Sequence, residues 1–199
     1  ISENAGVLAT NKREMKRRFE SEGVCTARFR EVSTLEELRQ AFDLFEKPVI
    51  CKAVDTSGSR GIIRVDTADD LPHAFEYVMR STRQKYFLVE EFISGVEFGA
   101  QAAVIDGEAQ FVMPHGDILY HGKTDVPIGH YVPYSMSDQV KSLVWTQLDK
   151  SITALGLTTC AINADFILRG DHVYVLEIGA RAGATCLPEL VSTHYEMDY

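Results

Sequence analysis

The 199-residue chain has no apolar run that could cross a membrane, since a span needs about 20 residues and its longest runs, such as PVICKAV, are far shorter. It has no N-terminal segment in which basic residues precede an apolar stretch, as a secretory signal would. Basic residues are scarce as well, because 20 Lys and Arg stand against 29 Asp and Glu and give a net charge of −9. This balance argues against a general binder of nucleic acids or anionic membranes. We therefore expect a cytoplasmic protein without a nucleic-acid or membrane partner; an oligomer is not excluded.

Cysteine is also in short supply. The chain has four cysteines, far apart and without a C-x-x-C pair, which favours reduced and mostly buried thiols over disulfides or zinc ligands. No Pro-rich, Ser-rich or single-charge linker and no internal repeat divides the sequence, so its length allows one domain or two small ones. The first residue is Ile1 and not a methionine, and we expect the chain to be part of a longer protein.

The first half alternates helical and extended patterns. Thr34 and Glu37 form a capping box ahead of a helical apolar face, and Pro48 stops that helix. Two β-branched segments flank the Gly/Ser cluster at 56–61 and predict a hairpin. The helix that contains Lys12 to Arg18 is strongly basic, and we expect its basic face to be solvated. In order, the predicted elements are a helix from about 11 to 23, a strand over 26–32, a helix over 35–45, strands over 48–54 and 62–65, a helix over 67–79 and a strand over 85–93.

The second half is more antiparallel. Asp106-Gly107 joins two extended segments within 98–113 and is a strong hairpin signal. Residues 114–134 are rich in His, Gly, Pro and Tyr without periodicity, which predicts a long loop. A helix from about Asp138 to Gly156 and two strands, over 159–168 and 172–179, complete the pattern. Helices alternating with largely antiparallel sheets predict an α+β fold.

A lysine on a buried strand precedes a loop rich in glycine and hydroxyl groups. Backbone N–H groups of such a loop can wrap a polyphosphate, and Lys52 adds a fixed positive charge. The pattern is not a Walker A loop, since no Gly-Lys-Ser/Thr opens a helix, and not a dinucleotide fingerprint, since the loop joins two strands. By itself it also fits a solvated hairpin turn. The candidate loop residues are Ser57, Gly58, Ser59 and Gly61.

Asp165 and Glu177 lie on the two strands that flank the turn at 169–171. Depending on the length of the turn, Asp165 faces either Leu176 or Glu177. Two facing carboxylates repel unless a cation or proton lies between them, which favours Mg²⁺ held by carboxylates and substrate phosphates. Arg181 follows where the strand ends and could add a bidentate phosphate contact. An acidic hairpin on the protein surface is the alternative.

A third segment, Glu90-Glu91-Phe92-Ile93, joins the two halves and is followed by Glu97. An extended segment can offer backbone groups to the edge of an adenine ring, and a carboxylate nearby can accept ribose hydroxyls. Alone the signal is weak, because acidic residues at the end of a strand are usually solvated.

Together and in this order, the three segments resemble the ATP-grasp superfamily, whose members include biotin carboxylase, carbamoyl phosphate synthetase, D-alanine–D-alanine ligase and L-amino acid ligases. The resemblance extends from about Asn11 to Arg181. It implies ATP and Mg²⁺ as cofactors and an α+β fold with ATP held between two subdomains. Here these would be residues 1–95, with the Gly-rich hairpin, and residues 96–199, with the metal site.

The resemblance also implies roles for individual residues. Lys12 and Lys52 would contact the phosphates, and Arg181 would steady the transferred phosphate, with Lys52 and Arg181 as the catalytic residues. Glu90 would lie near the adenine amino group and Glu97 would hold the ribose. Glu91 and Ile93, with Phe92 between them, would contact the base. Asp165 and Glu177 would bind Mg²⁺.

Two departures from the family pattern stand out. The usual ending Glu-x-Asn-x-Arg is Glu177-Ile178-Gly179-Ala180-Arg181 here, so one metal-binding side chain is missing. Asn163 shares a strand face with Asp165, and we expect it to replace that ligand. The second departure is the further N-terminal α/β domain of complete members, which this chain begins too late to include.

The resemblance implies that a substrate carboxylate attacks the γ-phosphate of MgATP and that an amine then displaces phosphate to give an amide. The expected substrates are a small carboxylic acid and an amine. Two alternatives stay open: an enzyme that activates bicarbonate, as a carboxylase or carbamoyl phosphate synthase does, and a non-catalytic ATP-binding regulatory domain.

Three histidines, His115, His121 and His130, lie with Lys123 in the expected loop at 114–134. Their spacing does not match a zinc site on one helix. They could line the acceptor pocket, but a solvated or loop-packing role is favoured, and we assign them no catalytic part.

Overall fold

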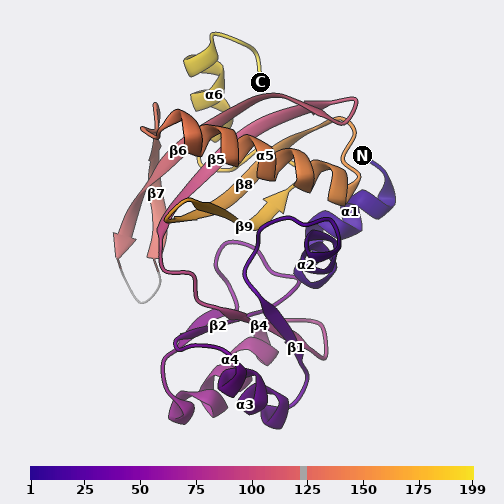
Figure 1. Ribbon diagram of the computed structural model, residues 1–199, viewed down its shortest axis with the longest axis vertical. Coiled ribbons are helices and arrows are strands. Elements are labelled where there is room, and N and C mark those ends of the chain that lie inside the picture. Colours follow the sequence, from indigo (N-terminus) through magenta and orange to yellow (C-terminus); the bar gives the residue numbers. More distant parts are fainter. Residues whose placement is uncertain (122–124) are drawn as a thin grey trace. The chain divides into compact units, whose positions relative to one another are not determined.

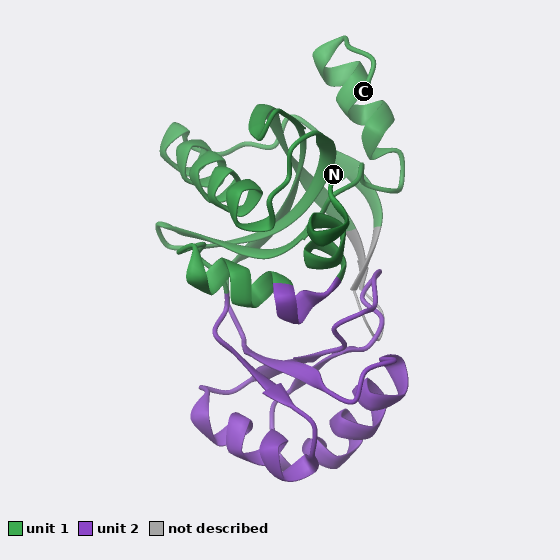
Figure 2. Cartoon of the chain, turned by 90° about the vertical axis from the view of Figure 1, so that its right-hand side faces the viewer, with its two compact units in different colours: residues 1–10, 15–26, 94–199 green, residues 11–14, 27–93 purple. Residues whose placement is uncertain are grey.

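The computed structural model describes residues 1–121 and 125–199. The chain forms two compact units, each discontinuous in the sequence (Figure 2). Unit 1 consists of residues 1–10, 15–26 and 94–199, and unit 2 of residues 11–14 and 27–93. Both combine helices with an antiparallel sheet, which confirms the α+β prediction. Within the described residues, no helix is both long and apolar enough to span a bilayer.

Unit 2 is built on a four-stranded sheet. Its elements are β1 (Phe29–Val32), α3 (Leu35–Leu44), β2 (Val49–Lys52), β3 (Ile62–Val65), the 3₁₀ turn η1 (Ala68–Asp70), α4 (Leu71–Ser81) and β4 (Phe87–Glu91). The strand order is β1-β4-β2-β3, and α3 and α4 pack together on one face (Figure 1). The predicted capping box is present, because Thr34 Oγ1 accepts from the Glu37 N–H while the Glu37 carboxylate accepts from the Thr34 N–H. The hairpin of β2 and β3 is confirmed as well.

The two faces of the unit 2 sheet differ because side chains alternate along a strand. Val49 and Cys51 of β2 are fully buried in the core beneath α3 and α4. Lys52 therefore points to the opposite face. On β4, Val89 belongs to the helix-side core, so Glu90 lies on the same face as Lys52. This alternation places a lysine and a glutamate on the face away from α3 and α4.

Unit 1 is built on a five-stranded sheet. The elements are α1 (Glu3–Thr10), most of α2 (Lys12–Ser21), β5 (Val96–Ile105), β6 (Glu108–His121), β7 (Asp125–Tyr131), α5 (Asp138–Leu155), β8 (Cys160–Arg169), β9 (His172–Gly179) and α6 (Leu187–Tyr195). The strand order is β7-β6-β5-β8-β9, with every pair antiparallel. The helix predicted to end at Gly156 is α5, which this glycine caps at a φ of +64°.

Helix α5 covers the apolar face of this sheet (Figure 1). Leu148 and Ile152 of the helix pack in one core with alternate strand residues such as Ala102 and Ala164. Residues of the other parity share the opposite face. We call this opposite side the polar face; its members include Glu97, Gly99, Gln101, His115, Asp117, Asn163, Asp165 and Glu177.

The segment 114–134 is not the loop that its composition predicted. Residues up to His121 continue β6, and residues 125–131 form β7, which pairs with it. The prediction was wrong because His, Gly and Pro obscure the alternation of a strand, whereas backbone pairing with β5 and β7 supplies the hydrogen bonds of the ladder independently of side-chain type.

Two other expectations need correction. Lys16, on the basic helix, is only 2% exposed, and its Nζ donates to Thr26 Oγ1 at 2.7 Å, so that part of the face is not solvated. All four cysteines are free, as expected, but only Cys51 is buried. Cys25 and Cys160 are half-buried and Cys186 is exposed, so the thiols are not mostly buried.

Candidate nucleotide and metal site

The loop between β2 and β3 turns at three residues with positive φ, namely Gly58, Ser59 and Gly61. A Cβ at Gly61 would lie 2.8 Å from the Ala53 Cβ and 2.7 Å from the Ser81 Cβ, so no larger residue fits without a shift. The Gly61 carbonyl accepts from the Ala53 N–H at 2.8 Å and closes the hairpin. Residues 57–59 are exposed at its tip, where an anion can reach them.

Lys12 lies beside this loop. Its Nζ donates to the Thr56 carbonyl at 2.6 Å and its N–H to the Val54 carbonyl at 2.9 Å, which ties the start of α2 to the hairpin. A pocket of about 380 Å³ opens between the loop and α4, and Arg60 and Arg83 are among its lining residues. Neither Lys12 nor Lys52 lines that pocket. Through its two bonds to Val54 and Thr56, Lys12 is a neighbour of the loop that was predicted to bind the same phosphates.

Lys52 and Glu90 form an ion pair on the face away from α3 and α4. The Lys52 Nζ lies 2.9 Å from Glu90 Oε2, and the two side chains are 13% and 2% exposed. Each charge would be costly to bury without the other. Glu90 therefore fixes the position of the Lys52 ammonium group.

The segment after Glu90 is held by contacts within unit 2. The Glu91 N–H donates to the Arg28 carbonyl at 3.0 Å, and the two side chains form an ion pair at 2.7 Å. A contact of the Glu91 backbone with an adenine would then use its carbonyl oxygen. The Arg64 guanidinium lies over the Phe92 ring, 4.9 Å from its centroid, and Ile93 is buried.

Asp165 and Glu177 are cross-strand partners on β8 and β9. Nearer the turn, Phe166 pairs with Val175, and the register then shifts by one residue so that Asp165 faces Glu177. A β-bulge at Leu176 produces this shift. Of the two registers that the sequence allowed, the structure has the one in which the carboxylates face each other.

The pKa of the Asp165 carboxyl group is raised to about 6. Burial is the largest cause, and the negative charges of Glu177, Asp117 and the exposed Glu97 add to it, while His115 acts in the opposite direction. Asp165 is nevertheless an exposed residue, so water reaches one side of its carboxyl group while protein atoms crowd the others. A carboxylate among other carboxylates favours a bound proton or cation.

Without divalent cations, we expect the contribution of Asp165 to stability to fall as the pH rises from about 4 to about 6. Its pKa is about 4 in an unfolded chain and about 6 in the folded protein, so the folded state binds the proton more tightly. The resulting stabilisation is complete below the lower value and lost above the upper one. Asp165→Asn should remove this part of the pH dependence. Urea denaturation across this range measures it; parallel curves for the two proteins would contradict the raised pKa.

Three further candidate residues lie near the end of β9. Asn163 Oδ1 accepts from Gln101 Nε2 at 2.6 Å, so a metal ion would share this oxygen. Gly179 pairs with Asn163 across the strands, and a Cβ there would come no closer than 3.8 Å to its neighbours. Arg181 is exposed, and its Nη1 donates to the Ala182 carbonyl at 2.9 Å.

Gln101 is a further residue near this site that was not predicted from the sequence. This fully buried side chain donates to Asn163 and accepts from the Gly183 N–H at 2.9 Å, so it joins β8 to the segment that follows Arg181. The backbone approaches closely, since a Cβ at Gly183 would lie 3.0 Å from Gln101 Nε2. A glutamine inside the apolar run GAQAAVI was the available signal, because a buried amide needs partners.

His115 and His130 were expected to be solvated or to pack within a loop, and Asp117 was not singled out, but the three lie together on β6 and β7. Their signal was the i, i+2 spacing of His115 and Asp117, which places both on one face of a strand, but the segment was expected to be a loop. The side chain of His121 and the whole of Lys123 lie outside the part of the chain that the structure describes.

A family profile for the ATP-grasp domain matches residues 9–185. The chain is 30% identical over 178 residues to formate-dependent phosphoribosylglycinamide formyltransferase of Synechococcus sp. (strain CC9605), covering 84% of this chain and 43% of that protein. It is 24% identical over 207 residues to alanine–anticapsin ligase of Bacillus subtilis (strain 168), covering 92% and 43%. The chain thus spans less than half the length of these curated relatives.

Solved structures have the same fold. Phosphoribosylglycinamide synthetase from Anaerococcus prevotii is 42% identical with a TM-score of 0.74, and the likeness covers 96% of this chain and 47% of that one. D-alanine–D-alanine ligase from Bacillus anthracis, complexed with ATP, has a TM-score of 0.76 at 18% identity and covers 98% and 63%. These likenesses extend over nearly the whole chain.

Proposed function

This chain belongs to the ATP-grasp family, as its motifs predicted. We propose that it is the ATP-grasp part of an ADP-forming ligase that joins a carboxylic acid to an amine. A substrate carboxylate attacks the γ-phosphate of ATP, giving an acyl phosphate and ADP, and the amine then displaces phosphate to form the amide. The observation that supports this most directly is the pairing of Asp165 with Glu177. Relatives that are ligases by name, such as alanine–anticapsin ligase and D-alanine–D-alanine ligase, support the reaction class.

Within this proposal, residues of unit 2 hold the phosphates and the adenine. Lys12 and Lys52 neutralise phosphate charge, and N–H groups at the tip of the loop donate to phosphate oxygens. Residues 1–95 and 96–199 would be the N-terminal and C-terminal subdomains, although residues 1–10 and 15–26 belong to unit 1. The remaining assignments are Ser57, Gly58, Ser59 and Gly61 to the phosphates, Glu90, Glu91, Phe92 and Ile93 to the adenine, and Glu97 to the ribose.

Asp165 and Glu177 would hold Mg²⁺, with Asn163 as a third ligand. The donor set fits, because Mg²⁺ prefers carboxylate and amide oxygens, and a cation relieves the charge crowding that raises the pKa of Asp165. Bound Mg²⁺ would neutralise charge on the phosphates. Arg181 would steady the transferred phosphate with its guanidinium group, and the reaction needs no protein nucleophile.

Two other functions are each favoured by one observation. The chain is 27% identical over 161 residues to the carbamoyl phosphate synthase large chain of Lachnoclostridium phytofermentans, which favours an enzyme that activates bicarbonate. Gly179, in place of an asparagine ligand, favours a regulatory domain that binds ATP without turnover. ADP release on adding bicarbonate alone would support the first, and ATP binding without acid-dependent hydrolysis would support the second.

For the main proposal the partners are a small acid and an amine, and the compartment is the cytoplasm.

Calorimetric titration with ATP, with and without Mg²⁺, tests the proposed site. We expect binding that depends strongly on Mg²⁺, because the Asp165 and Glu177 carboxylates would otherwise repel the phosphates. Binding that is indifferent to Mg²⁺ would favour the regulatory function. The absence of binding would contradict the assignment of the nucleotide site to this chain.

Restoring the family's asparagine should improve the site. We expect Gly179→Asn to tighten Mg²⁺-dependent ATP binding by about 10-fold, at the lower end of the effects seen when the surroundings of a metal ion change. A side chain fits there, because the nearest atoms to an added Cβ are 3.8 Å away. The same calorimetry measures the effect, with Gly179→Ala as the matched control, since it fills the space without adding a ligand. Equal affinities in the two variants would rule out a metal contact from position 179.

A further inference from the structure

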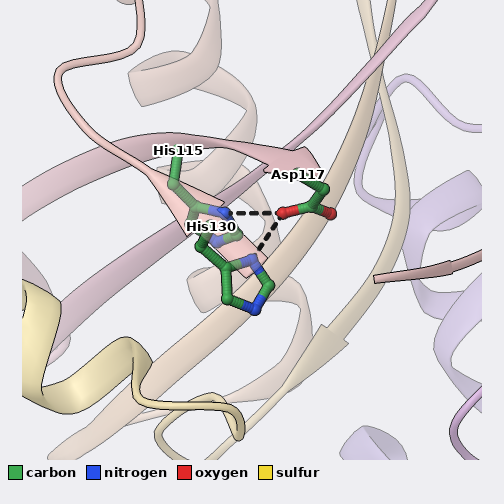
Figure 3. A group of neighbouring side chains, drawn as sticks. All are labelled: His115, Asp117 and His130. Carbon is green, nitrogen blue, oxygen red and sulfur yellow. Dashed lines mark hydrogen bonds and ion pairs between the residues drawn. The ribbon is translucent and has the colours of Figure 1, made fainter. Parts of the chain in front are cut away.

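Three polar side chains converge on the polar face of unit 1, where β6 pairs with β7 (Figure 3). The His115 Nδ1 lies 3.1 Å from Asp117 Oδ1, and the His130 Nδ1 lies 2.7 Å from the same oxygen. One potential ligand atom from each residue lies within 4.8 Å of the other two. We call these residues the His–Asp cluster.

The backbone fixes the cluster in place. His115 and Asp117 are two residues apart on β6, and Asp117 pairs with His130 on β7, so all three face the same side. The His115 and His130 side chains are only 3% and 7% exposed, whereas Asp117 is 28% exposed. Gly99 admits the His115 ring, because a Cβ there would lie 2.3 Å from the ring. The nitrogens are therefore held in place, and the cluster opens to water at Asp117.

From this geometry we propose that the His–Asp cluster binds a divalent transition-metal cation of the Zn²⁺ or Co²⁺ class. Two imidazole nitrogens and a carboxylate oxygen form a donor set that such ions prefer and that leaves a coordination position open. At bond lengths of about 2.1 Å, ligand atoms of a tetrahedral site lie about 3.4 Å apart. The two nitrogen–oxygen separations seen here, 3.1 and 2.7 Å, are about 0.3 and 0.7 Å shorter than that, so the side chains would need to move apart by these amounts.

The surroundings of the cluster support a cation. One Asp117 oxygen lies within hydrogen-bond distance of both histidine Nδ1 atoms, so the three proposed ligand atoms already face one another. When Nδ1 binds a metal, Nε2 carries the proton and needs an acceptor. The His130 Nε2 has one in Thr185 Oγ1 at 2.6 Å. The His115 Nε2 lies 3.4 Å from the Gln101 amide nitrogen, and that amide is held in place by its bonds to Asn163 and Gly183.

This site differs in chemistry from the proposed Mg²⁺ site and does not depend on the proposed function. Imidazole nitrogen suits Zn²⁺ and Co²⁺, whereas Mg²⁺ prefers the oxygen ligands of Asp165 and Glu177. A large excess of Mg²⁺ should therefore occupy the site at Asp165 and Glu177 and leave the His–Asp cluster available to Co²⁺.

The test is a titration of the whole chain with Co²⁺, in excess Mg²⁺ and without nucleotide. The visible absorption spectrum of the bound Co²⁺ is recorded at each addition. We expect one equivalent of Co²⁺ to give an intense band typical of a four-coordinate site, and Zn²⁺ to displace it. The proposal would be wrong if the bound Co²⁺ absorbed only weakly, as octahedral Co²⁺ does, and if excess Mg²⁺ displaced it.

Variants locate the ion. Asp117→Asn and His130→Ala should each weaken Co²⁺ binding by at least about 10-fold, and thermal melting without metal shows whether each variant is folded. His172→Ala, which removes an exposed histidine, and Cys186→Ser, which removes the exposed thiol, should leave binding unchanged. If these controls abolish the band, or if folded Asp117→Asn and His130→Ala both retain it, the ion lies elsewhere and the proposal is wrong.

Discussion

Replacing Glu177 with glutamine should reduce Mg²⁺-dependent ADP formation by about 1,000-fold, comparable to the loss of a principal group that stabilises transition-state charge. The change removes a negative charge opposite Asp165 while keeping the size of the side chain. A neutral amide oxygen holds Mg²⁺ less strongly than a carboxylate. The measurement is coupled detection of ADP with the complete enzyme and its acid substrate, together with calorimetry of ATP binding by this chain.

The matched control for this variant is Glu189→Gln, which changes an exposed carboxylate on α6 in the same unit. It should leave both ADP formation and ATP binding unchanged. Near wild-type activity in Glu177→Gln would show that the metal site has been assigned to the wrong residues. A loss of activity in both variants would point instead to a general effect of charge.

Lys52→Met should lower the free energy of unfolding by about 3 kcal/mol, because removal of one member of a buried ion pair leaves the other charge poorly compensated. Glu90 is only 2% exposed and lies 2.9 Å from the lysine nitrogen. Chemical denaturation measures the loss. Lys85→Met, at an exposed lysine just before β4, is the control and should have little effect.

The double variant Lys52→Met/Glu90→Gln separates the cause from simple loss of packing. We expect it to recover part of the stability lost in Lys52→Met, because the uncompensated carboxylate is gone. If the double variant is less stable than Lys52→Met by the full cost of a second, independent change, the ion pair does not explain the effect. ATP binding should be weak in both proteins, since each lacks the lysine proposed for the phosphates.

Most elements of the fold were predictable because their signals are local. The capping box of Thr34 and Glu37, the glycine that ends α5 and the Asp106-Gly107 turn all depend on a few neighbouring residues. The pairing of Asp165 was predictable only as one of two registers. The bulge at Leu176 decided between them, and a bulge has no reliable signal in a single sequence.

What the sequence could not provide depends on contacts between distant segments. Lys16 looked solvated because basic residues surround it, yet its ammonium group is held by Thr26 and its stem is buried. The His–Asp cluster requires β6 and β7 to pair over a segment whose composition is typical of a loop. Gln101 was recognisable as a polar residue in an apolar strand, but its partners Asn163 and Gly183 come from elsewhere in the chain.

The division of the chain between its two units also constrains how synthesis and folding can proceed. Met15 and Phe19 of α2 are buried in the core of unit 1 with residues of β5, α5 and β8. Those partners emerge from the ribosome only after all of unit 2 has been made. During translation the apolar side of α2 is therefore exposed until its final partners have been synthesised, and chaperones can bind it in that interval. A fragment that ends at residue 93 would expose the same surface permanently, so the boundary between the units is a poor place at which to truncate this protein.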